Sequence, residues 1–141
     1  MMRPLLIAGL PASGKSVLAR KFKDKILEFD SIAEKFGSYE ELNEEREFAV
    51  NQFQLMAQFG KFQIFVDVFG TKESRQNITA ILQIKPDIII VCCPLEECIR
   101  RNNIRLNSMI SNEEIIKIYW NFEPVHKEEG FNSIIYYNSF Q

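Results

Sequence analysis

Histidine and cysteine are scarce in this sequence, which limits the metal and disulfide sites that it can form. There is one histidine, His126, and there are three cysteines, Cys92, Cys93 and Cys98. The cysteines have no C-x-x-C spacing and no neighbouring histidine, so we expect neither a zinc site nor a disulfide framework. We expect the thiols to be buried and His126 to lie on the surface.

Long apolar runs and an excess of positive charge are also missing. The first apolar run breaks after Leu10 and no later run approaches the length of a membrane span, so we expect no signal peptide, no membrane segment and a cytoplasmic location. The net charge of −2, from 17 basic and 19 acidic residues, argues against a broad basic face for duplex nucleic acid. A short nucleic-acid end or a small molecule is compatible with this charge, and no obligate protein partner is indicated.

The composition is otherwise that of an ordinary globular protein, with 46% hydrophobic residues. A length of 141 residues fits a single domain over residues 1–141. Segments 5–8, 25–29, 62–68, 87–93 and 133–137 are predicted strands, separated by predicted helices. Five strands that alternate with helices predict an α/β fold with a parallel sheet.

Caps and breakers predict where the helices begin and end. Ser31 and Glu34 have the spacing of a capping box, at the start of a helical region whose long helix, of about 20 residues, ends at Gly60. Further helices are predicted over 72–82, from Pro94 and from Ser111. The buried stripe expected on the long helix is formed by Leu42, Ala49, Phe53 and Met56, with Phe48, Leu55 and Phe59 beside it. The buried stripe expected on the last helix is formed by Ile115, Ile118, Tyr119 and Phe122, with Trp120 partly packed.

Residues 9–16, Gly-Leu-Pro-Ala-Ser-Gly-Lys-Ser, match the phosphate-binding motif G-x-x-x-x-G-K-[ST] at every fixed position. A predicted strand precedes the motif and a predicted helix, from residue 16 to 22, follows it, as such a loop requires. Backbone N–H groups would surround the β-phosphate, Lys15 would be a solvent-facing ligand of the β- and γ-phosphates, and Ser16 would ligate Mg²⁺. The residues predicted to bind the nucleotide are Gly9, Pro11, Ala12, Ser13, Gly14, Lys15, Ser16 and Val17.

Two aspartates lie at the ends of predicted strands, at the edge where open α/β sheets gather their active groups. Asp30 is predicted either as the general base that accepts the proton of an attacking hydroxyl or as the N-cap of the helix that begins at Ser31. Asp67 is predicted to belong to the magnesium site through a bound water or to hold a catalytic arginine. The alternative for Asp67 is that it caps the turn through Gly70.

Arginines gather after the fourth predicted strand. Arg101 and Arg105 are four residues apart, so a helix would place both on one face. They are predicted to belong to a small lid, over about residues 101–112, that closes over the transferring phosphate. The alternative is a solvated helix face in which Glu96 and Glu97 pair with Arg100 and Arg101.

Several motifs taken together resemble the small P-loop kinases of the polynucleotide-kinase-like, or zeta-toxin-like, group. They are the GxPxSGKS loop, the aspartate after the second strand, Phe65-Val66-Asp67 followed by Arg75, the run from Pro94 to Asn102 with Arg105, and Phe122-Glu123-Pro124 leading to Glu129-Gly130-Phe131. The resemblance covers nearly the whole chain. It implies a three-layer P-loop NTPase fold with sheet order 2-3-1-4-5, ATP and Mg²⁺ as cofactors, and catalytic roles for Lys15, Asp30 and Arg101 or Arg105.

The acceptor side departs from the pattern of this group. Ala33 stands where an arginine usually follows the basic aspartate, and Asp67-Val68-Phe69 replaces the usual Asp-Thr-Asn. The leading expectation is a kinase acting on the 5′-hydroxyl of a polynucleotide. A nucleoside, nucleotide or other small-molecule kinase is the second, and a P-loop NTPase that acts as a switch on a protein partner is the third.

Overall fold

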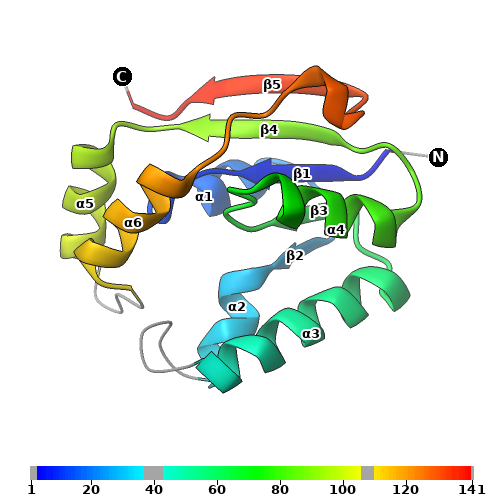
Figure 1. The fold of residues 1–141 in the computed structure, drawn as a ribbon, viewed down its shortest axis with the longest axis horizontal. Helices are drawn as coiled ribbons and strands as arrows, with labels where there is room; N and C mark the ends of the chain where they lie inside the picture. Colours follow the sequence, from blue (N-terminus) through cyan, green and yellow to red (C-terminus); the bar gives the residue numbers. More distant parts are fainter. Residues whose placement is uncertain (1–2, 37–42, 106–109, 141) are drawn as a thin grey trace.

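Five parallel strands form one sheet in the order β2-β3-β1-β4-β5 (Figure 1). The computed structural model describes residues 3–36, 43–105 and 110–140. The strands are β1 (Leu5–Ala8), β2 (Ile26–Glu28), β3 (Ile64–Val66), β4 (Asp87–Cys92) and β5 (Ser133–Asn138). The strand order confirms the predicted fold, and each strand lies within one residue of a predicted segment or inside it.

The helices fill the intervals between the strands. They are α1 (Lys15–Ala19), α2 (Phe29–Ala33), α3 (Asn43–Phe59), α4 (Lys72–Leu82), α5 (Leu95–Ile104) and α6 (Asn112–Asn121), with short 3₁₀ helices η1 (Glu34–Phe36) and η3 (Lys127–Glu129). Two N-caps explain why the starts of α4 and α6 match the predictions: the Thr71 hydroxyl accepts from Ser74 N–H, and the Ser111 hydroxyl accepts from Glu114 N–H. Among the described residues no helix is long and apolar enough to span a membrane.

Helices cover both faces of the sheet. On one face α2, α3 and α4 pack against alternate strand residues such as Leu6, Phe65 and Ile88. On the other face α1 contributes Leu18 and Ala19 to a smaller cluster. A third cluster joins α5 and α6 beyond the carboxyl ends of the strands, where Figure 1 shows the two helices beside each other.

The start of α2 differs from the prediction. β2 ends at Glu28, and Phe29 and Asp30 already belong to the first turn of α2, so Asp30 is not the N-cap and Ser31 does not begin a capping box. Glu28 occupies the N-cap position without a side-chain hydrogen bond to the helix. The carboxylate of Asp30 lies instead in the first helical turn, where the helix dipole favours negative charge.

Several apolar side chains that we expected in or beside the buried stripes are exposed. Those of Phe48, Leu55 and Phe59 on α3 are exposed, and so is that of Tyr119 on α6; Leu42 falls outside the described residues. Trp120 is 76% exposed and makes an edge contact with Tyr119, so its predicted packing is wrong. Cys98 is buried as predicted, but Cys92 is exposed and Cys93 is half-buried. His126 is exposed, as predicted.

A buried ion pair joins α4 to the segment that precedes β5. The guanidinium of Arg75 is 0% exposed and makes a two-pronged contact with Glu129, with Nε to Oε1 at 2.7 Å and Nη2 to Oε2 at 3.1 Å. Arg75 also donates to the carbonyls of Phe69 and Pro124. Burial alone would raise the pKa of Glu129, but the hydrogen bonds from Arg75 and from His126 N–H outweigh it and hold this pKa below its usual value.

Replacing Arg75 with methionine should lower the free energy of unfolding by about 3–5 kcal/mol, because it leaves the carboxylate of Glu129 buried without its cation. Urea unfolding measures this change. The double replacement Arg75→Met with Glu129→Met should recover part of the loss. Glu73→Gln, an exposed change on the same helix, serves as the control and should stay within about 0.5 kcal/mol. A loss below about 1 kcal/mol in Arg75→Met would contradict a stabilising pair.

Candidate functional site

The loop between β1 and α1 has the backbone of a phosphate-binding loop. Gly9, Ala12 and Gly14 have φ values of 152°, 63° and 106°, in the left-handed range that glycine adopts without strain. A Cβ atom on Gly9 would lie 2.8 Å from Ser13 Oγ and 2.9 Å from the Val91 carbonyl oxygen, so no larger residue fits there. Ser13 Oγ is buried and has no hydrogen-bond partner among the described residues. The tight turn suits a loop whose N–H groups close around an anion.

Lys15 is buried rather than solvent-facing, which corrects the sequence prediction. Its side chain is 7% exposed, and Nζ donates to the carbonyl oxygens of Gly9 at 2.9 Å and Leu10 at 2.8 Å. Burial lowers the pKa of Lys15, while the charges of Asp30 and Asp67 act in the opposite direction. A phosphate would offer this ammonium group a charged acceptor in place of neutral carbonyls.

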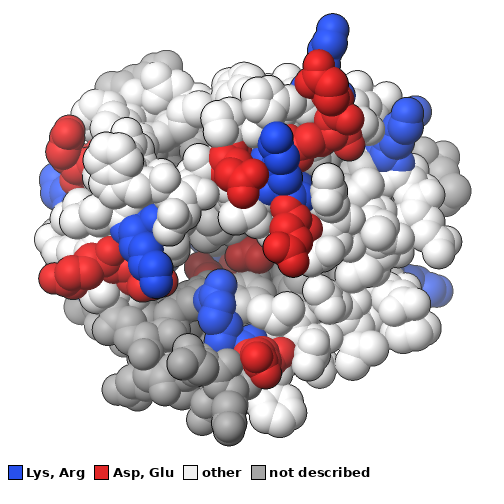
Figure 2. All heavy atoms as spheres, in the orientation of Figure 1, with Lys and Arg blue, Asp and Glu red and all other residues white. Residues whose placement is uncertain are grey.

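A cleft of about 910 Å³ opens at the carboxyl ends of the strands. Figure 2 shows this face hollowed, with acidic atoms recessed in the hollow and a basic side chain beside them. Of the residues predicted to bind the nucleotide, Gly9 and Ser13 do not line the cleft; those that do are Pro11, Ala12, Gly14, Lys15, Ser16 and Val17. Asp30 and Asp67 line the same cleft, so the structure brings the loop and both predicted aspartates together.

The carboxylates of the cleft include one that the sequence did not indicate. Ser16 Oγ donates to Glu28 Oε2 at 3.3 Å, and Glu28 also lines the cleft. Asp67 Oδ1 accepts from the N–H of Val68 at 2.8 Å, so it stabilises the turn after β3 and faces the cleft as well. Burial raises the pKa of Asp67 to about 6, against the opposing effect of this hydrogen bond. A cation bound beside Asp67 would oppose the effect of burial and favour the ionised carboxylate.

The residues present fit a magnesium ion that is bound together with phosphates. Among the described residues no cluster of three or more His, Cys, Asp or Glu could hold a metal by itself. Mg²⁺ in nucleotide sites usually takes only one or two protein ligands, with waters and phosphate oxygens completing its shell. The hydroxyl of Ser16 and the carboxylate of Asp67, both on the cleft wall, are suitable groups for that role.

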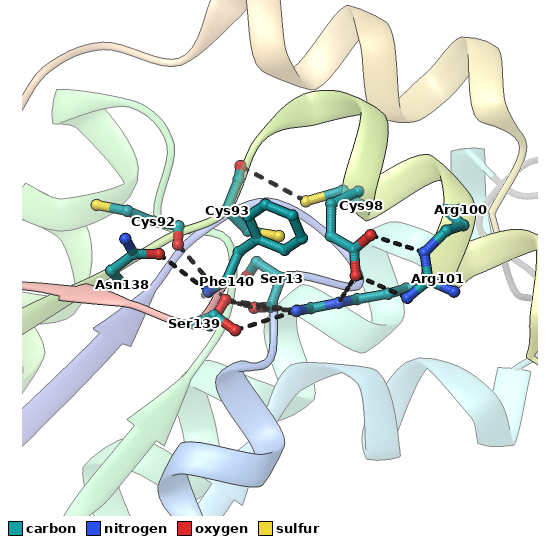
Figure 3. A network of polar contacts seen from close by, with 10 residues as sticks. Ser13, Cys92, Cys93, Cys98, Arg100, Arg101, Asn138, Ser139 and Phe140 are labelled. Atoms are coloured by element: carbon teal, nitrogen blue, oxygen red, sulfur yellow. Dashed lines mark hydrogen bonds and ion pairs between the residues drawn. The ribbon is translucent and has the colours of Figure 1, made fainter.

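Arg101 lies against the phosphate-binding loop (Figure 3). Its Nη1 donates to the Ser13 carbonyl at 3.0 Å, its Nη2 to the Ser139 carbonyl at 3.0 Å, and its Nε to Glu97 Oε2 at 2.8 Å. Hydrogen bonds from Arg100 and Arg101 lower the pKa of Glu97 to about 2. The predicted pairing of Glu97 with Arg101 is thus present, but Arg100 pairs with Glu97 and not with Glu96.

Arg105 does not share a helical face with Arg101, which corrects the spacing argument. α5 ends at Ile104, and Arg105 has an extended conformation with ψ of 136°. Both arginines nevertheless line the cleft, and Arg105 is exposed. The central part of the predicted lid, residues 106–109, lies outside the described residues.

The cleft residues that the sequence did not indicate include Glu28, Arg46 and Ser139. Arg46, in the first half of α3, lies over the ring of Phe29 at 5.4 Å from its centroid. Ser139 follows β5, and its hydroxyl donates to the Ser13 carbonyl. Glu28 sits in a strand, Arg46 among charged helix residues and Ser139 after the last strand, and none of these positions carries a motif that would single it out.

Comparison with known proteins gives the fold. No family model matches the sequence, and a search of curated proteins finds no match. A sugar kinase from Janibacter sp. HTCC2649 superimposes with a TM-score of 0.72 at 15% identity, over 98% of this chain and 86% of that one. A gluconokinase from Sinorhizobium meliloti 1021 gives 0.68 at 10% identity, over 99% and 83%. A chain of a Pnkp1/Rnl/Hen1 complex gives 0.58 at 19% identity, over 72% and 40%. The chain therefore has the fold of P-loop kinases.

Proposed function

We propose that this chain is an ATP- and Mg²⁺-dependent phosphotransferase that transfers the γ-phosphate to a hydroxyl group. The observation that carries the proposal is one cleft lined by the phosphate-binding loop, Asp30 and Asp67 together. The likeness of the fold to kinases supports it. A phosphate-binding loop alone would fit any nucleotide-binding protein, whereas a second carboxylate on the cleft wall supplies an acceptor for a proton.

The donor side consists of the loop and Lys15. The loop's N–H groups and the first turn of α1 hold the β-phosphate, and Nζ of Lys15 moves from the carbonyls of Gly9 and Leu10 to the phosphate oxygens. Ser16 and Asp67 would hold Mg²⁺, which would neutralise part of the phosphate charge. Arg105, on the cleft wall, is the cation that we assign to the transferring phosphate.

Asp30 is the general base of the proposal. Its carboxylate takes the proton of the acceptor hydroxyl as the acceptor oxygen bonds to the γ-phosphorus, while the bond from that phosphorus to the β–γ bridging oxygen breaks and ADP leaves. Asp30 lies in the first turn of α2 and lines the cleft beside the phosphate-binding loop. An ionised carboxylate is the form that accepts a proton.

The acceptor wall favours a small molecule with several hydroxyl groups. Besides Asp30 and Asp67 it includes Ser31, Glu34 and Thr71, which are hydroxyl and carboxylate groups that hydrogen-bond to alcohols. Two of the similar structures are described as a sugar kinase and a gluconokinase. A sugar-like acceptor is therefore the first candidate.

The 5′-hydroxyl of a polynucleotide, the leading acceptor of the sequence analysis, is the second candidate. Arg46 and Lys117 line the cleft and supply positive charge for one or two phosphates next to that hydroxyl. The net charge of −2 argues against an extended basic track. Binding of a single strand should then give a slope of log K against log salt of about −0.7 to −1.4.

Parallel assays with γ-labelled ATP test the function and rank the acceptors. The panel contains sugars and sugar acids, nucleosides, nucleotides and 5′-hydroxyl oligonucleotides, with ATP alone as the control for hydrolysis. Label on a sugar-like acceptor is the expected result. Label on oligonucleotides, with a shallow salt slope and no gain with length, would favour the second candidate. Phosphate release without transfer to any acceptor would contradict the phosphotransferase and favour an NTPase switch.

A further inference from the structure

The carbonyl group of Ser13 is the point where three distant parts of the chain meet. It accepts hydrogen bonds from Arg101 Nη1 on α5 and from the hydroxyl of Ser139 after β5. Arg101 also donates to the Ser139 carbonyl and, through Nη1, to the Ser139 hydroxyl at 3.4 Å. Figure 3 shows the three residues as one connected group.

Both partners of Ser13 are themselves held in place. The N–H of Ser139 donates to the Cys92 carbonyl at 3.1 Å, which fixes Ser139 at the end of β4. Glu97, one turn before Arg101 on α5, accepts from Arg101 Nε at 2.8 Å and so orients the guanidinium group. The carbonyl of Ser13 is therefore held by the sheet on one side and by α5 on the other.

Ser13 is placed where it can transmit this support to the phosphate site. It is 1% exposed and does not line the cleft, whereas its neighbours Gly14 and Lys15 do. A Cβ atom on Gly14 would lie 3.5 Å from Ser139 Cβ and 3.6 Å from Arg101 Nη1, so both residues pack closely against the loop. A loop whose N–H groups must converge on one anion binds it more tightly when its shape is set in advance.

We propose that Arg101 and Ser139 are positioning residues that set the shape of the phosphate-binding loop through the Ser13 carbonyl. The inference rests on the proposed nucleotide site and differs from the lid role, in which Arg101 would contact the transferring phosphate. All three nitrogen atoms of the guanidinium are engaged in hydrogen bonds within the protein. Contact with the transferring phosphate would require Arg101 to give up this arrangement.

The test measures nucleotide affinity and steady-state kinetics in four variants. They are Arg101→Met, Ser139→Ala, the two combined, and Arg100→Met as the matched control. Arg100 also pairs with Glu97, but it is 61% exposed and its described hydrogen bonds do not reach the loop. A fluorescent ATP analogue, without acceptor, reports affinity. Circular dichroism confirms that each variant is folded, and Ser139→Ala decides the question if Arg101→Met does not fold.

The expected result is a loss of nucleotide affinity of about tenfold in Arg101→Met and a smaller loss in Ser139→Ala. The combined variant should lose less than the product of the two single effects, because both act on one carbonyl. KM for ATP should rise accordingly, kcat at saturating ATP should stay within about threefold of wild type, and Arg100→Met should behave as wild type.

A fall in kcat at unchanged affinity in Arg101→Met would overturn the proposal and restore the transition-state role. The proposal would also be overturned if Ser139→Ala left the nucleotide affinity unchanged and the affinity loss in the combined variant equalled the product of the two single losses. The affinity measurements test the positioning role independently of the phosphoryl-transfer assay that tests the proposed function. A chain that binds ATP but transfers phosphate to no hydroxyl would contradict the function, and the affinities would still decide the positioning role.

Discussion

Phosphoryl transfer should fall by about 10³-fold or more when Lys15 is replaced with alanine, while the fold remains intact. Nζ of Lys15 is the buried cation of the loop, and its present partners are two neutral carbonyls that belong to the loop itself. The fold does not depend on an ion pair at this position, because no carboxylate is within salt-bridge distance of Lys15 among the described contacts. Removing a desolvated charge should leave the unfolding midpoint unchanged or slightly higher.

The measurement combines a γ-labelled ATP assay with a thermal melt of the same preparation. Lys23→Ala, which removes an exposed lysine between α1 and β2, is the matched control and should match wild type in both. Turnover at the wild-type rate in Lys15→Ala would show that the loop does not bind the transferred phosphate.

Asp30→Asn should lower kcat by about 10²–10⁴-fold with nucleotide affinity nearly unchanged, because a general base acts on the acceptor. The amide keeps the size of the side chain but cannot take the proton. Asp30 lies in the first turn of α2, away from the N-cap position, so the change should cost little helix stability. Single-turnover rates and ATP binding separate the two effects.

Glu34→Gln removes another carboxylate from the cleft wall and is the control for a general loss of negative charge. Its kcat should fall far less than that of Asp30→Asn. Equal phosphoryl-transfer rates in Asp30→Asn and wild type would show that Asp30 is not the general base.

Features set by short stretches of sequence were predicted from it. The sheet order follows from apolar runs that alternate with amphipathic ones, and the limits of α4 coincide with the prediction because Thr71 caps it within four residues. The loop at 9–16 was found because its glycines and Lys15 are set by local geometry. These features need no knowledge of distant contacts.

Boundaries without a local signal were missed. α2 starts directly from β2, and Glu28 at its N-cap makes no capping hydrogen bond that a sequence pattern would reveal. α1 ends at Ala19, although the predicted helical stretch continued through Arg20 and Lys21 to Phe22. In both places the packing of the chain, rather than intrinsic helix preference, decides where the helix lies.

The site was predicted only where its residues carry a motif. Asp30 and Asp67 were found because they follow strands, but Ser139 lies 126 residues from Ser13, and no spacing rule connects positions so far apart. The same limit applies to Arg101. Its four-residue spacing from Arg105 suggested a shared face, and its contacts with Ser13 and Ser139 depend on how α5 packs against the loop.

The buried pair of Arg75 and Glu129 has a consequence for how this sequence can diverge. The two residues are 54 positions apart, and changing either one alone leaves a charge enclosed without its partner. We expect selection to remove such a single change, because small domains have only a few kcal/mol of stability to lose. The two positions should therefore be inherited together or lost together, so in evolutionary terms they behave as one site.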